Sequence, residues 1–155
     1  MILFSLGTHD QDFSRMAKAA DDYAAVTDER IIVQTGYTHY KFKHVKEFFD
    51  FCPKEQMTAL MDEADILVLQ GGWGGMCEAV DKGKRVVVIP RINGVEHVHD
   101  QGQVVRKMEQ LGCVLGVYDT KDLPNVIEKA RTYIFKPLKR GNASIIKETL
   151  EHWFK

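Results

Sequence analysis

A glycine-rich segment, GGWGG at 71–75, separates a predicted buried strand from a predicted helix, and Glu78 follows it. A helix N-terminus presents backbone N–H groups without intrahelical partners and carries about half a positive charge. Glycine has no Cβ, so the backbone at 71–75 can come close to a ligand. A phosphate or diphosphate is the usual ligand of such a place, and we expect one here.

Glu78 follows the last of these glycines by about one helical turn. A carboxylate there can accept hydrogen bonds from two neighbouring hydroxyls of a ribose joined to the diphosphate. Two structural explanations remain open. The helix dipole favours an acid early in a helix, and the glycines can serve only the close packing of a helix on a strand.

The glycine pattern differs from two well-known phosphate motifs. No Lys-Ser/Thr pair follows the segment, so it is not a P-loop. The dinucleotide fingerprint follows the first strand of its fold and has an acidic residue about 20 positions later, whereas 71–75 follows the fourth predicted strand. A Rossmann enzyme that uses NAD is therefore a disfavoured alternative.

Two further polar segments follow predicted strands, GTHDQDF at 7–13 and NGVEHVHDQGQ at 93–103. The second concentrates carboxylate, imidazole and amide groups, which suits recognition of sugar hydroxyls. Its His97, His99 and Asp100 could also bind a metal. Because neighbouring i and i+2 side chains do not share one helical face, we predict no metal site.

The elements that must position these segments follow from the apolar pattern. Strands are predicted at 2–6, 30–34, 45–51, 65–70, 85–90 and 113–117. Helices are predicted at 14–26, 53–63, 76–82, 98–111, 121–132 and 142–154. Several strands are apolar throughout, as in a parallel sheet that is covered on both faces. The alternation predicts an α/β fold, a Rossmann-like three-layer sandwich with a mainly parallel sheet.

The length of 155 residues suits one domain over 1–155, and the net charge of −1 provides no global field for nucleic acid or an anionic membrane. Three cysteines without a CxxC motif favour a reduced, cytoplasmic compartment. No apolar run approaches the ~20 residues of a transmembrane helix. The last predicted helix, at 142–155, is amphipathic; it either packs on its own domain or docks a partner.

Five segments together resemble one family in their order and spacing. They are GTHDQDF at 7–13, QTG at 34–36, the glycine segment ending in Glu78, PR at 90–91 and EHVHDQGQ at 96–103. The family is the C-terminal, donor-binding domain of family 28 glycosyltransferases. The chain resembles above all the free-standing version found in two-subunit enzymes, such as the eukaryotic dolichol-linked N-acetylglucosaminyltransferase and bacterial capsule and exopolysaccharide transferases.

The resemblance implies the C-terminal half of a GT-B fold that binds a UDP-sugar. It implies an inverting transfer of a hexose to a polyprenyl-diphosphate-linked saccharide, in surface polysaccharide or glycan-precursor synthesis, without an obligatory metal or cofactor. The chain opens on its first strand, so a separate, membrane-anchored subunit is expected to bind the acceptor and to bring this cytoplasmic chain to the inner face of the membrane. The alternative is a nucleotide-binding regulatory subunit without catalytic activity.

The resemblance also assigns roles to individual residues. Those expected around the diphosphate are Gly72, Trp73, Gly74 and Gly75, with the N–H groups of Met76 and Cys77. Those expected to approach the phosphates or the donor sugar from the first loop are Gly7, Thr8 and His9. Glu78 would hold the ribose, Asp100 and Gln103 the hexose hydroxyls, and Phe51 and Cys52 would flank the uracil.

His9 is the candidate general base on this side of the reaction, although the base can also belong to the partner. Two positions depart from the family pattern. Gln70 stands where many relatives have His, and Gly75 stands where they usually have Ser or Thr, so one hydroxyl that could bind a phosphate is missing.

Overall fold

The computed structural model describes residues 1–92 and 101–138. Its elements in chain order are β1 (Ile2–Ser5), α1 (Ser14–Ala24), β2 (Ile31–Gln34), β3 (Glu47–Phe49), α2 (Lys54–Glu63), β4 (Ile66–Gln70), α3 (Trp73–Asp81), β5 (Arg85–Ile89), α4 (Gln101–Gln110), β6 (Leu115–Gly116), a 3₁₀ turn (Thr120–Asp122) and α5 (Leu123–Thr132). None of the helices in these ranges is long and apolar enough to cross a membrane.

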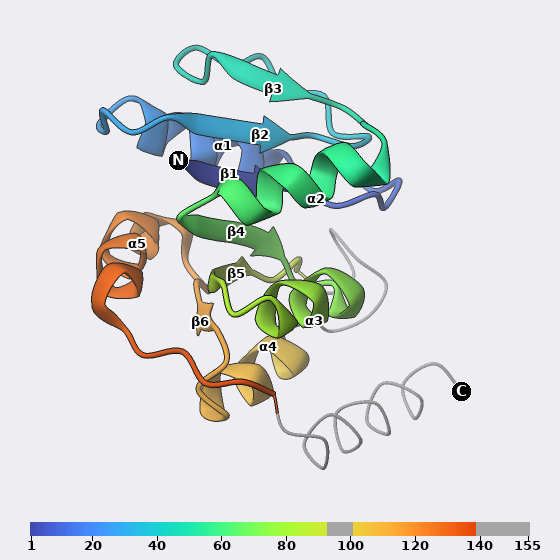
Figure 1. Ribbon diagram of the computed structural model, residues 1–155. Coiled ribbons are helices and arrows are strands. Elements are labelled where there is room, and N and C mark those ends of the chain that lie inside the picture. Colours follow the sequence, from blue (N-terminus) through green and yellow to red (C-terminus); the bar gives the residue numbers. More distant parts are fainter. Residues whose placement is uncertain (93–100, 139–155) are drawn as a thin grey trace.

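The strands form one parallel sheet in the order β3-β2-β1-β4-β5-β6 (Figure 1). In the middle of the sheet, Ile2 lies opposite Ile31 on one side and Ile66 on the other. The strand order reverses between β1 and β4, and ligands of open α/β sheets bind beside the carboxyl ends of the strands at such a point. The prediction of a Rossmann-like α/β sandwich is therefore confirmed.

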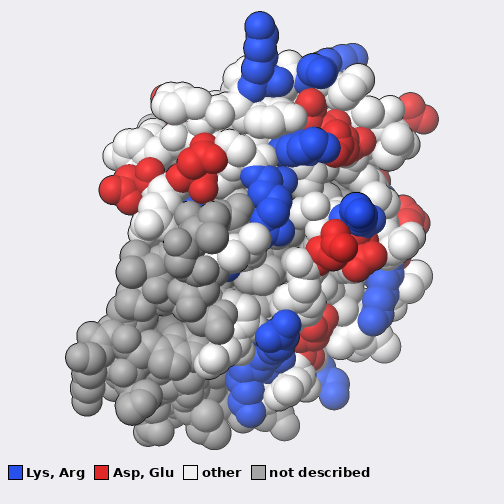
Figure 2. Space-filling model, turned by 180° about the vertical axis from the view of Figure 1, so that it is seen from behind, with Lys and Arg blue, Asp and Glu red and all other residues white. Residues whose placement is uncertain are grey.

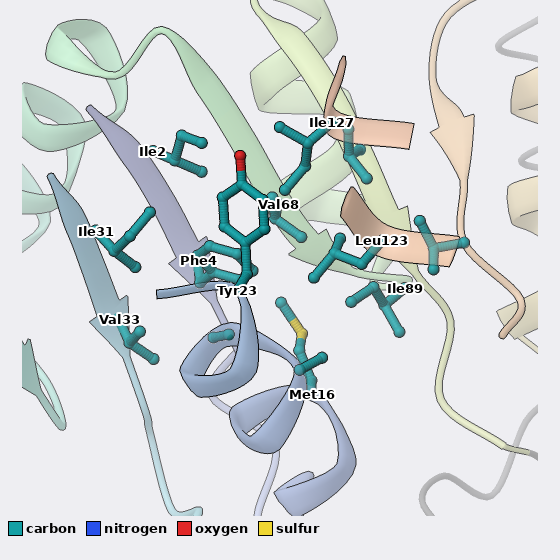
Figure 3. Packing of buried hydrophobic residues seen from close by; sticks show 14 of the residues in the cluster. Ile2, Phe4, Met16, Tyr23, Ile31, Val33, Val68, Ile89, Leu123 and Ile127 are labelled. Carbon is teal, nitrogen blue, oxygen red and sulfur yellow. The ribbon is translucent and has the colours of Figure 1, made fainter. Parts of the chain in front are cut away.

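Alternate residues of each strand face opposite sides of the sheet, which explains the continuous apolar runs. Phe4 and Val68 face the layer of α1 and α5, whereas Leu3 and Leu67 face the layer of α2, α3 and α4. Figure 3 shows side chains of α1 (Met16 and Tyr23) and α5 (Leu123) packed over the first of these faces. Both faces of the central strands are thus buried, which fixes the positions of their carboxyl ends.

Several predicted boundaries differ from the observed ones. β3 covers only Glu47–Phe49, because the N–H of Val45 donates to the buried carboxylate of Asp21 at 3.0 Å and not to a neighbouring strand. Pro53 is the N-cap of α2 and lies just before its first turn. The predicted start of the helix at 98–111 and the whole helix at 142–154 lie outside the described residues.

The helix C-termini agree with the sequence. Gly83 (φ +69°) follows α3 and Gly112 (φ +78°) follows α4. These left-handed conformations are the ones that favour glycine after a helix.

Candidate functional site

A cavity of about 200 Å³ lies beside the carboxyl ends of β1 and β4, at the reversal of the strand order. Its walls come from the ends of β1, β2 and β4, from the segments after β1 and β3, and from α2 and α3. The lining residues are Ser5, Thr8, Gln34, Phe51, Cys52, Met57, Met61, Leu69, Gly75 and Glu78. The fold therefore brings together five of the residues singled out in the sequence, from three separate segments.

The glycines before and inside α3 fall into two kinds. A Cβ added to Gly72 would meet Nε2 of Gln70 at 2.1 Å, so this glycine leaves room for the Gln70 side chain in its present position. A Cβ added to Gly74 or Gly75 would meet nothing within 4 Å. Close packing explains the first kind, whereas the second leaves open space over the first turn of a helix, where an anion can bind.

α3 begins at Trp73, three residues earlier than predicted, because glycine can adopt helical angles as well as loop angles. The N–H of Met76 therefore donates to the carbonyl of Gly72 at 3.2 Å, and the helix pairs the N–H of Cys77 with the carbonyl of Trp73. The N–H of Met76 is thus used within the helix, and the expected contact of Met76 and Cys77 with a ligand stays a prediction. The first-turn N–H groups without intrahelical partners belong to residues 73–75.

Glu78 lies three residues after Gly75, on the same face of α3, and both line the cavity. Its side chain is exposed. A ligand whose anionic part lies over the first turn of α3 would therefore have its next hydroxyl groups within reach of the Glu78 carboxylate.

The opposite wall of the cavity is largely apolar. Met57 and Met61 project from α2, and Phe51 lies beside them with its ring 5.0 Å from that of Tyr37 in an edge-to-face arrangement. Methionine side chains adapt to flat rings and make favourable sulfur–aromatic contacts. This wall suits a planar aromatic group such as a nucleobase.

Gln34, the first residue of the QTG segment, has no role assigned from the sequence, and in the structure it holds two walls of the cavity together. Its Nε2 donates to the carbonyl of Gly7 at 3.2 Å and to that of Asp50 at 2.9 Å. Its Oε1 accepts from the hydroxyl of Ser5 at 2.7 Å. The side chain is buried, so these bonds fix the loops after β1 and β3 relative to each other. The sequence feature that could have indicated this role is a glutamine at the end of the apolar run IIVQ.

The loop after β1 turns at Gly7 (φ +87°) and is held by Arg91. The buried Arg91 guanidinium donates to the carbonyls of Leu6 and Gln11, each at 2.9 Å, and lies 4.5 Å from the centre of the Phe13 ring. This loop presents Thr8 to the cavity. Arg91 therefore acts on the site through the shape of the loop.

The imidazole of His9 is engaged within the same loop. Its Nδ1 accepts from the N–H of Gln11 at 3.2 Å and lies 3.4 Å from Oδ1 of Asp10. In the neutral ring the contact with the N–H of Gln11 favours a proton on Nε2, whereas the contact with the Asp10 carboxylate favours a proton on Nδ1. The ring can therefore donate to an anion from Nε2 when it is charged or in the first tautomer, and it can accept a proton at Nε2 in the second.

Gln103 lies on the exposed face of α4 and does not line the cavity, whereas Gln101, two residues earlier, is buried beneath the glycine segment. A Cβ on Gly71 would meet Oε1 of Gln101 at 2.8 Å. Asp100 and the histidines considered with it as metal ligands lie outside the described residues. Within 1–92 and 101–138, no three His, Cys, Asp or Glu side chains are grouped as metal ligands would be.

The sheet order and the cavity define an α/β domain with a cavity at its topological switch point, the place where many nucleotide-binding proteins of this class hold their ligand. The chain belongs to the glycosyltransferase family 28 C-terminal domain family, whose model matches residues 1–152. This membership supports a transferase role with a nucleotide-sugar donor. No curated protein sequence matches the chain.

Solved glycosyltransferases share the fold. The glycotransferase of kitacinnamycin superposes with a TM-score of 0.65 at 21% identity over 97% of this chain, and VinC, solved in complex with dTDP, with 0.53 at 18% over 98%. The chain spans only 39% and 37% of those two proteins. ALG13 gives a TM-score of 0.63 at 16% identity, with 99% of this chain and 96% of ALG13 covered.

Proposed function

We propose that this chain is the donor-binding catalytic subunit of an inverting glycosyltransferase that transfers a hexose from a UDP-sugar to a polyprenyl-diphosphate-linked saccharide. The observation that carries the proposal is that Phe51, Glu78 and Gly75 line one cavity. An apolar wall, a carboxylate and a helix N-terminus match the base, the ribose and the diphosphate of a nucleotide.

In this arrangement the uracil lies between Phe51 and the methionines of α2, with Cys52 at its edge. Glu78 accepts hydrogen bonds from the ribose hydroxyls. The diphosphate lies over the first turn of α3, at the N–H groups of residues 73–75, with Thr8 on its other side. Asp100 and Gln103 are proposed to bind the hydroxyls of the hexose.

The leaving UDP gains negative charge as the anomeric bond breaks. Donors that are already oriented toward the diphosphate stabilise this charge without reorganisation, and each well-placed donor is worth about 3 kcal/mol. We assign His9 to this group, because its imidazole donates from Nε2 when it is charged and in the neutral tautomer that the N–H of Gln11 favours. The base that deprotonates the acceptor hydroxyl is then supplied by the acceptor-binding protein.

The proposed partner is a membrane-anchored protein that binds the lipid-linked acceptor and recruits this chain from the cytoplasm. The proposal is supported by the family, which describes a C-terminal domain, and by the similarity over nearly the full length of ALG13. It is also supported by the solved glycosyltransferases of more than twice this length, in which the chain matches one part.

Calorimetric titration of the purified chain with UDP, UDP-GlcNAc, UDP-galactose, UDP-glucuronic acid and NAD tests the donor site. We expect tighter binding of one UDP-sugar than of UDP, lost in Glu78→Ala and retained in the control Glu55→Ala, which changes an exposed acid in the first turn of α2. Binding of NAD alone would contradict the proposal. Sugar transfer in the presence of the partner separates the catalytic subunit from a regulatory subunit, which would bind the donor without turnover.

A further inference from the structure

The segment that leads into β3, together with β3 itself, forms an exposed surface rich in cations and aromatic rings. We call it the β3-edge surface, and its exposed members are Tyr37, His39, Lys41, Lys43, His44, Lys46 and Phe48. Figure 2 shows lysine and arginine side chains that project from the upper end of the molecule, the end that β3 occupies in Figure 1. The net charge of −1 for the whole chain conceals this local concentration.

The aromatic rings of this surface are held in place from below. Phe42 and Tyr40 pack against the core beneath α1, with ring centres 5.1 Å apart, and Phe48 packs on Phe42 at 4.8 Å. Phe48 is nevertheless 54% exposed, as is Tyr37. Exposed rings on a rigid support are common where a protein meets an apolar phase or another molecule.

The backbone of the cationic segment is fixed by a buried acid. Asp21 accepts hydrogen bonds from the N–H groups of Lys43, His44 and Val45, at 2.8 to 3.2 Å. The Asp21 carboxylate is therefore occupied by backbone hydrogen bonds beneath the surface, while the side chains of Lys43 and His44 remain exposed. The surface keeps its shape without a ligand.

The acids near this surface do not neutralise its lysines. Glu47 is bound by Arg30 through two bonds of 2.7 Å, and Asp50 accepts from the N–H of Phe51 at 2.6 Å. Among the described residues, no carboxylate forms an ion pair with Lys41, Lys43 or Lys46. Three positive charges are therefore available to an external anion.

An open hollow of about 680 Å³ adjoins these charges. It lies between the segment at 38–41 and β3, with Phe48 and Phe49 on one side and His39 and Lys41 on the other. It is larger and more open than the cavity at the strand reversal, and none of the residues assigned to the donor lines it.

We propose that the β3-edge surface docks directly on an anionic phospholipid bilayer, with Phe48 and Tyr37 in the interfacial region and the three lysines at the headgroup phosphates. This inference goes beyond the proposed function, because it gives the chain a membrane contact of its own. Interfacial aromatic rings and nearby lysines are the groups that such surfaces attract, at about 1 kcal/mol per basic residue.

Two other kinds of partner fit less well. Lysine is depleted in the buried centres of protein interfaces, whereas it is favoured at membrane surfaces. Single-stranded nucleic acid needs ring faces on which bases can stack. Here Tyr40 packs edge to face on Phe42, and Phe42 is covered in turn by Phe48, so Tyr40 and Phe42 do not add to the exposed rings of Phe48 and Tyr37.

Co-sedimentation with vesicles tests the proposal without any donor or acceptor. We expect the chain to bind vesicles of phosphatidylcholine that contain about one third phosphatidylglycerol, and not vesicles of phosphatidylcholine alone. The triple variant Lys41→Gln/Lys43→Gln/Lys46→Gln should lower the partition coefficient at least about tenfold. Phe48→Ser should lower it several-fold through the loss of ring burial.

The matched control is Lys107→Gln/Lys121→Gln/Lys129→Gln, which removes the same charge from exposed positions on α4, the 3₁₀ turn and α5. It should bind like the unaltered chain, and circular dichroism should show that every variant is folded. Equal loss in both triple variants, equal binding to neutral vesicles, or binding of a uridine oligonucleotide without any binding to vesicles would overturn the proposal. Titration with UDP on the same samples reports the donor site separately.

Discussion

The side-chain amide of Gln101 donates to Oε1 of Gln70 at 2.9 Å, which joins the first residue of α4 to the last residue of β4. Oε1 of Gln101 accepts in turn from the backbone N–H of Arg91 at 3.0 Å. The Gln70 side chain lies so close to Gly7 and Gly72 that a Cβ on either would contact it. The buried amide of Gln101 therefore joins the end of β4 to Arg91, which follows β5. Through Gln70 it also supports the loops at Gly7 and Gly72, which approach the proposed diphosphate.

Replacing Gln101 with Met should uncouple this arrangement. Methionine fills a similar volume but leaves the N–H of Arg91 and the amide oxygen of Gln70 without their partner, at a cost of about 1–3 kcal/mol for each buried group. We expect a lower free energy of unfolding in urea and weaker binding of UDP, because the glycine segment loses its support. An unchanged affinity for UDP in a destabilised variant would show that the link stabilises the fold without shaping the site.

Gln103→Met is the control for that experiment. Gln103 lies two residues further along the same helix and is exposed, so its replacement should change neither the stability nor the affinity for UDP. The same variant tests the role proposed for Gln103 at the hexose. If Gln103 binds sugar hydroxyls, only the affinity for the UDP-sugar should fall.

Gly75→Ser should strengthen the donor site. A Cβ at this exposed helical position meets nothing within 4 Å, and serine has a better helix propensity than glycine by about 0.5 kcal/mol. The added hydroxyl can donate to a phosphate, which corresponds to a gain in UDP affinity of up to about tenfold. Calorimetry and thermal unfolding measure the two effects.

Gly72→Ser is the contrasting variant, because its Cβ would meet Nε2 of Gln70 at 2.1 Å. It should lower the melting temperature. If Gly75→Ser instead weakened UDP binding while the protein became more stable, the ligand itself would occupy the space above Gly75, and the diphosphate would lie closer to the helix than proposed.

Much of the fold could be predicted because buried parallel strands are short apolar runs that end at polar or glycine residues. The run predicted at 65–70 became β4 (Ile66–Gln70), one residue shorter. The error at β3 has a different cause. Val45 is buried like a strand residue, but its N–H bonds to Asp21 of α1, and this competition between a side chain and a strand depends on tertiary structure.

The candidate site was predictable only in part. Glycines and Glu78 stand out because their chemistry is local and their spacing is short. Gln34 and Gln101 act by bonding to backbone or amide groups that are 10 to 31 residues away in the chain, and no periodicity reveals such pairs. The start of α3 was misplaced because glycine carries a poor helix propensity, which the packing of α3 on the sheet outweighs.

His9→Gln separates a hydrogen-bond donor from a general base. Gln can still donate an N–H from nearly the same position, so kcat should fall less than about tenfold if His9 stabilises the leaving diphosphate. Loss of a general base would instead lower kcat by about 10² to 10⁴. Steady-state transfer assays across pH, with the acceptor-binding partner present, distinguish these results.

Asp21→Asn should make the stability of the protein less sensitive to acid. Burial opposes the charged form of Asp21, but the N–H groups of Val45, His44 and Lys43 outweigh it and hold the pKa of this carboxyl below its ordinary value. A carboxyl with a lowered folded-state pKa stabilises the fold above its unfolded pKa of about 3.9, and this contribution disappears as the pH falls through the folded-state pKa. The free energy of unfolding of the variant in urea should therefore be lower by about 1–3 kcal/mol at pH 7 and by much less near pH 3.

The control is Asp22→Asn, which alters an exposed neighbour that pairs with Lys18 on the surface. It should change the free energy of unfolding by less than about 0.5 kcal/mol at both pH values. A loss for Asp21→Asn that is the same at pH 7 and pH 3 would show that packing, and not the ionised carboxylate, holds the segment at 43–45.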